Sequence, residues 1–71
     1  MALPKEERIK LKKKLPYGSQ SKVAKQLGTT RSRVYQYIVG LNNDLTIEDA
    51  LVSILQKEKE RNERLVDIIN G

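Results

Sequence analysis

The sequence contains neither cysteine nor histidine. Without cysteine there is no disulfide framework and no thiolate metal site, and without histidine the commonest general base and metal ligand are both missing. The acidic residues are scattered, and a helical chain of 71 residues offers little room for a substrate pocket. We therefore expect a protein that is not an enzyme and that needs no cofactor or metal.

Long apolar runs are also absent. No stretch approaches the roughly 18 apolar residues of a membrane-spanning helix, and the N-terminus lacks the apolar core of a signal peptide. There is no glycine-rich phosphate loop, internal repeat or strand pattern. The sequence predicts a soluble, cytoplasmic protein without a membrane partner.

Positive charge is concentrated in the first part of the chain. Residues 1–40 hold ten Lys/Arg against two Glu, and residues 41–71 hold four Lys/Arg against seven Asp/Glu, so that the two parts carry +8 and −3. A basic segment is where a polyanion would bind, although composition alone fits an ordinary lysine-rich surface equally well.

Helix start and stop signals recur along the chain. Pro4 and Pro16 bracket a first helix, with acidic residues near its start and a lysine run near its end. Ser19 is a suitable N-cap for a second helix that runs through Leu27. Gly28 then permits the left-handed conformation of a sharp turn.

Two further helices follow. Thr30 is expected to cap a third helix that runs to about Val39 and ends before Gly40. Thr46, with Asp49 three residues later, resembles a capping box and predicts a fourth helix over about 46–69. A helix from 47 to 69 would be about 35 Å long, so its far end must lie in solvent, fold back or meet a partner.

The expected fold is all-α: a small four-helix domain over residues 1–71 with an extended C-terminal helix. Two short helices joined by a tight glycine-containing turn, at 19–40, have helix-turn-helix geometry. Four apolar side chains are spaced to fasten this pair to the rest of the domain. They are Val23, Leu27, Val34 and Tyr37.

The stretch SQSKVAKQLGTTRSRVYQYIVG, from Ser19 to Gly40, resembles the phage lambda-repressor-like (Cro/XRE) helix-turn-helix family. The match covers 22 of 71 residues without a gap, with eight fitting positions at fixed spacing. The segment RVYQYIV is also similar to the recognition helix of the LacI family, in which an apolar pair occurs near the place of Ile38 and Val39. Both resemblances imply a DNA-binding protein of bacterial or phage type.

The resemblance to the lambda-repressor-like family also implies a set of DNA contacts. It places Gln20 against a phosphate, and it places Arg31, Ser32 and Gln36 toward base edges, with Thr30 and Arg33 nearer the DNA backbone. The side-chain chemistry agrees, because arginine can donate to guanine O6 and N7 and glutamine can pair with adenine. Tyr35 could contact a thymine methyl group or a phosphate.

We therefore expect a sequence-specific, double-stranded DNA-binding transcriptional regulator, repressor-like, with residues 30–39 in the major groove. Helix-turn-helix proteins commonly bind as two-fold dimers, and an apolar cluster near the C-terminus is the expected homodimer surface, with Ile38 or Val39 as additional candidates. The cluster comprises Leu65, Val66, Ile68 and Ile69. The alternative is that this cluster packs back on its own domain.

Two other roles are open at this point. The long C-terminal helix could serve a protein-interaction module, such as an antitoxin or a phage accessory factor. The lysines of 10–14 could instead bind RNA or a membrane surface nonspecifically, which needs no recognition helix.

Overall fold

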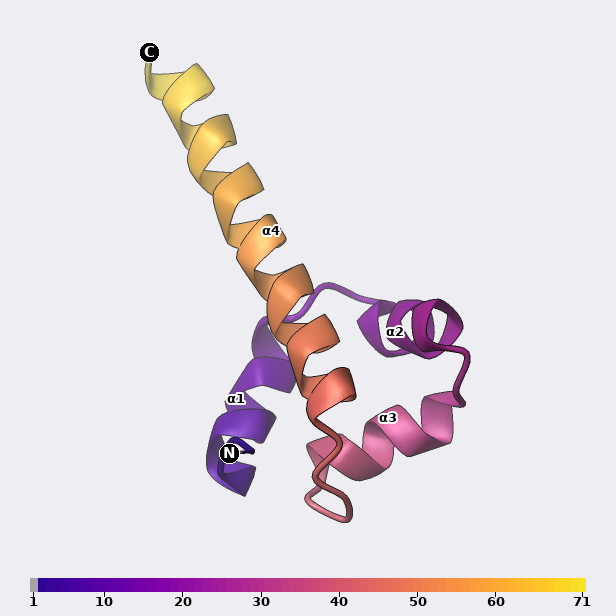
Figure 1. Ribbon diagram of the computed structural model, residues 1–71. Helices are drawn as coiled ribbons and strands as arrows, with labels where there is room; N and C mark the ends of the chain where they lie inside the picture. Colours follow the sequence, from indigo (N-terminus) through magenta and orange to yellow (C-terminus); the bar gives the residue numbers. More distant parts are fainter. Residues whose placement is uncertain (1) are drawn as a thin grey trace.

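Helices account for most of the structure, a computed structural model that describes residues 2–71 (Figure 1). In chain order they are α1 (Lys5–Lys14), α2 (Ser19–Leu27), α3 (Arg31–Ile38) and α4 (Leu45–Asn70). The described part of the chain contains no strand. The prediction of an all-α fold with four helices and an extended last helix is confirmed.

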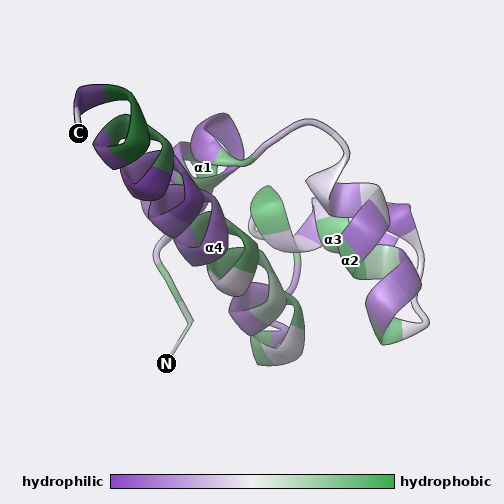
Figure 2. Cartoon of the chain, turned by 90° about the horizontal axis from the view of Figure 1, so that it is seen from above, coloured by the Kyte–Doolittle hydropathy of each residue, from purple (hydrophilic) through white to green (hydrophobic). Residues whose placement is uncertain are grey.

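The first half of α4 packs with the three shorter helices, and its second half projects beyond them (Figure 1). We call the packed part, residues 2–55, the body and the projecting part, residues 56–70, the tip. The principal extents of 44 × 25 × 18 Å reflect this projection. Viewed from above, the end of the tip is apolar and is separated from the body by a polar stretch of the same helix (Figure 2).

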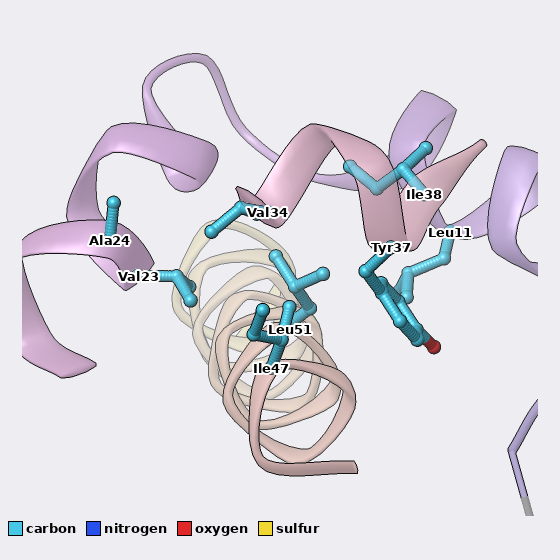
Figure 3. Packing of buried hydrophobic residues seen from close by; sticks show 8 residues of the cluster. All are labelled: Leu11, Val23, Ala24, Val34, Tyr37, Ile38, Ile47 and Leu51. Atoms are coloured by element: carbon cyan, nitrogen blue, oxygen red, sulfur yellow. The ribbon is translucent and has the colours of Figure 1, made fainter. Parts of the chain in front are cut away.

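The core of the body is built from all four helices (Figure 3). It comprises Leu11, Val23, Ala24, Val34, Tyr37, Ile38, Ile47 and Leu51. Val34 and Tyr37 are fully buried, as their expected role as anchors of α3 requires. The suggestion that Ile38 could contribute to a dimer surface is wrong, because the last turn of α3 points this side chain into the core and leaves it 1% exposed.

The turn between α2 and α3 follows the sequence prediction. Gly28 adopts φ 67°, and its amide donates to the Lys25 carbonyl while the Thr29 amide donates to that of Ala24. These bonds satisfy carbonyls that the end of a helix would otherwise leave free. The Thr30 hydroxyl accepts from the Arg33 amide at 3.2 Å, so Thr30 is the expected N-cap of α3.

Two of the predicted caps are wrong. The N-cap of α2 is Gly18, with φ 84°, and the hydroxyl of Ser19 donates to the Pro16 carbonyl at 2.6 Å instead of accepting from the helix. Helix α4 is capped by Asp44, whose carboxylate accepts from the amides of Thr46 and Ile47, so the helix begins at Leu45. An aspartate directly before the helix reaches these amides without help from a Thr46–Asp49 pair.

A buried polar network joins the N-terminal segment, α1, α3 and α4. The Arg8 side chain is 4% exposed, and its guanidinium donates to the carbonyls of Leu3, Tyr37 and Asn42 and to the side chain of Asn43. It also lies 4.4 Å from the centre of the Tyr37 ring. No sequence signal had distinguished Arg8 from the exposed basic residues around it.

Glu48 completes this network. Its carboxylate accepts from the Leu3 amide at 2.6 Å and from the Tyr37 hydroxyl at 2.7 Å. The bond from Leu3 lowers the pKa of Glu48 below its usual range; burial opposes this, and the Tyr37 bond and the charge of Arg8 add to it. Burial and the bond to Glu48 raise the pKa of Tyr37 well above that of a free tyrosine. Tyr37 therefore stays a hydrogen-bond donor at physiological pH.

Acid is expected to weaken the fold through Glu48. A carboxyl whose pKa is lowered by folding stabilises the folded chain above its unfolded pKa, about 4.3 for glutamate, and this contribution is lost as the pH falls through the lower folded value. The urea midpoint, followed by circular dichroism, should hold from neutral pH to about pH 5 and decline below it. Glu48→Gln should make this decline of the urea midpoint smaller, whereas Glu63→Gln, at an exposed position, is a control and should leave it unchanged. Equal declines in the two variants would contradict the attribution of the acid sensitivity to Glu48.

Candidate nucleic-acid interface

Helix α3 presents a polar face to solvent. Val34, Tyr37 and Ile38 turn inward, which leaves the remaining side chains of the helix exposed. These exposed side chains are Arg31, Ser32, Arg33, Tyr35 and Gln36. Every α3 residue that the sequence nominated for DNA contact is therefore accessible.

The start of α2 lies beside this face. Gln20, half-buried in the first turn of α2, shares a shallow concave surface with Arg31, Ser32 and Tyr35. The turn between α2 and α3 folds the two helices against each other and so brings together residues eleven or more positions apart. Gln36 lies one helical turn beyond Ser32 and extends the exposed face.

Lys12 is a member of this concave surface that the sequence analysis missed. It comes from the last turn of α1, and its ammonium group lies 5.6 Å from the centre of the Tyr35 ring. Such a separation is within the range of a cation–π contact. The lysine run at 12–14 was predicted to be the end of the first helix, and it is. The packing of α1 on α3 decides which of these lysines faces the concave surface.

The surface is free of negative charge. A second hollow adjoins the first, from the end of α1 to the start of α2, and shares Lys12, Gln20 and Arg31 with it. No aspartate or glutamate lines either one. The first turns of α2 and α3 also lack acidic residues, unlike those of α1 and α4. The positive ends of these two helix dipoles are therefore uncompensated by side chains, which suits an anionic ligand.

Two of the nominated residues are already engaged within the protein. The Arg33 guanidinium lies 3.2 Å from the Asp44 carboxylate, although the Arg33 side chain is 52% exposed. Burial raises the pKa of Asp44, but bonds from the Ile47 and Thr46 amides and from Arg33 outweigh this and lower it overall. Thr30 uses its hydroxyl as the cap of α3. Both residues are thus placed to position α3 as well as to reach a ligand.

Part of the expected positive charge is not available to a ligand, because Arg8 is buried in the core network.

Among residues 2–71, no group of three or more acidic side chains is placed to hold a metal ion. In the same part of the chain, no helix has the length and apolar character needed to cross a membrane. No protein-family model, curated protein sequence or solved structure matches the chain.

Proposed function

We propose that the protein is a sequence-specific, double-stranded DNA-binding transcriptional regulator, repressor-like, that places α3 in the major groove. One observation carries this proposal: Arg31, Ser32 and Tyr35 of the exposed α3 face share two adjoining hollows with Lys12 and the start of α2, and no acidic side chain of residues 2–71 lines either hollow. A face of this kind on a short, well-anchored helix fits the groove geometry of helix-turn-helix proteins.

The side chains divide into two roles. Arg31 can donate to guanine O6 and N7, and Gln36 can pair with adenine, whereas Ser32 can bond to several base edges. Lys12 and Gln20, at the border of the α3 face, suit contacts with phosphates, as does the first turn of α2, which carries no acidic residue. Tyr35, which is 48% exposed, can reach a thymine methyl group or a phosphate.

Selection from a pool of random duplex DNA is the direct test. The full chain should enrich a common motif, and the motif should contain a guanine at the position that Arg31 reads. Retention of the pool without enrichment would contradict sequence-specific recognition and favour the nonspecific binding of polyanions by the lysines.

Replacing Arg31 with alanine is expected to weaken binding to the selected duplex by about 1–3 kcal/mol and to relax the preference at one base position. Arg64→Ala removes the same charge from the exposed tip, far from α3, and is the matched control. Fluorescence anisotropy with the selected duplex and with single-base variants would measure both effects. Equal losses for the two variants would contradict a role of Arg31 in reading bases.

The response to salt separates phosphate contacts from base contacts. If about six phosphates are neutralised, log affinity should fall with log salt at a slope near −5. Lys12→Ala should lower this slope by about one and weaken all duplexes alike. An affinity that does not change with salt would contradict the proposed mode of binding.

A further inference from the structure

The apolar end of the tip is left without a partner by the fold. Its four large aliphatic side chains are 44–80% exposed. They are Leu65, Val66, Ile68 and Ile69. The alternative that this cluster packs back on its own body is therefore wrong, because α4 continues straight into solvent (Figure 1).

The exposed cluster continues a stripe that begins in the core. Residues spaced alternately by four and three positions lie along one face of α4. They are Leu51, Leu55, Glu58, Asn62, Leu65 and Ile69. Leu51 is fully buried, Leu55 and Glu58 are half-buried, and the rest are exposed. This spacing is the heptad repeat by which two helices pack together, and a single asparagine in such a stripe is a known device for fixing register.

An open groove overlaps this face where the body ends and shares Leu55, Glu58 and Asn62 with the stripe. It is bordered by Lys14 at the end of α1 and runs along α4 past Leu55, Glu58 and Asn62 to Val66. The partly exposed surface of Leu55 lies at its inner end. A helix of about the same length as the tip could therefore lie against α4 without displacing the body.

The charges of the tip favour its own copy as the occupant. Residues 56–70 carry four Lys/Arg and four Asp/Glu in mixed order, so the tip has no net charge, whereas the whole chain carries +5. A neutral, mixed surface gives no advantage to an acidic or basic partner or to an anionic membrane. Pairing would also remove from water the apolar side chains at the end of the tip, which would stabilise the pair.

We propose that two copies of the chain pair through their α4 tips as an antiparallel two-helix coiled coil. The pair crosses near Asn62, so that Ile69 of each copy reaches the Leu55 surface of the other. A parallel pair would set the two Glu58 carboxylates face to face in the stripe and bring two positively charged bodies to the same end. The antiparallel pair avoids both contacts. This inference does not depend on DNA binding.

Sedimentation equilibrium of the full chain, without DNA, tests the pairing. The mass should rise with concentration from 8.1 kDa to twice that value. Leu65→Asp should raise the dimer dissociation constant by about 100-fold, because each dimer loses two buried leucines. Leu45→Asp, at a leucine of similar exposure on the body, is the control and should leave the constant unchanged. Circular dichroism would verify that both variants keep their helices.

The direction of pairing can be tested by cross-linking, because the chain has no cysteine of its own. On mild oxidation, a mixture of Leu55→Cys and Ile69→Cys chains should form disulfide-linked dimers, and Ile69→Cys chains alone should not. Cross-linking of Ile69→Cys chains alone would overturn the antiparallel arrangement. A mass of 8.1 kDa at every concentration would overturn the proposed self-association. The same mass is expected if the tip binds only a different protein, so that outcome also overturns the proposal.

Discussion

Replacing Arg8 with alanine should lower the free energy of unfolding by about 3–5 kcal/mol, because it removes four hydrogen bonds donated by a buried charged group and leaves their acceptors without this partner. The substitution leaves the buried Tyr37 carbonyl without this donor, and it also removes the donor of the partly buried carbonyls of Leu3 and Asn42. It also leaves the buried Glu48 carboxylate without its nearby cation. Because a chain of this size has a total stability of roughly 4–11 kcal/mol, the loss should amount to between about a quarter and all of that stability.

Urea unfolding followed by circular dichroism would measure this loss. Arg33→Ala is the matched control, because it removes the same side chain from an ion pair on the surface. Exposed pairs contribute about 0–1 kcal/mol, so the two variants should differ several-fold. A similar small effect of both substitutions would show that the Arg8 network does not hold the body together.

Leu51→Ala should cost about 2–5 kcal/mol, for a different reason. Leu51 is fully buried where α4 meets the other helices (Figure 3), and truncation removes apolar contacts and leaves a cavity. Within residues 2–71 the core has eight buried apolar residues and six partly buried ones packed against it, and a core of this size has few neighbours that can move to fill the space. Thermal unfolding should therefore shift to a markedly lower temperature.

Leu45→Ala provides the comparison within the same helix. Leu45 is 46% exposed at the first turn of α4, so its truncation removes less buried surface than truncation of the fully buried Leu51. The two variants have the same change in helix propensity, so the difference between them reports burial alone. Equal stability of the two variants would mean that α4 does not complete the core.

The helices of the body were predictable because their ends carry local signals. Gly28 and Thr30 act at the turn as their conformational and hydrogen-bonding properties predict, and Val34 and Tyr37 are buried at helical spacing. Each of these features depends on residues within one turn of the chain. Local physical chemistry is therefore sufficient to predict these helix ends and buried positions from the sequence.

The errors arose at two helix starts, where a neighbouring residue supplies the cap, and at Arg8, where distant segments decide the outcome. Ser19 turns its hydroxyl back to Pro16 because Gly18 already bends the chain into α2. Asp44 caps α4, although the sequence predicted that Thr46 begins this helix. Arg8 resembles any other basic residue until α3 and the following loop bring three acceptors to it.

The candidate site shows the same division. The exposed face of α3 followed from helical spacing, since burial of Val34 and Tyr37 leaves Arg31 and Gln36 outside. The contribution of Lys12 did not follow, because it depends on how α1 packs on α3. The Arg33–Asp44 pair likewise joins two helices across a loop and has no signature in either segment.

The hydrogen bonds of Arg8 bear on how α3 would meet a ligand. By donating to the Tyr37 carbonyl and to the loop after α3, this one side chain of α1 fixes the far end of the helix, while the Thr30 cap fixes its near end. With both ends held, a bound ligand would restrict the exposed side chains of α3 but not its backbone. The ordering entropy that opposes binding is correspondingly small.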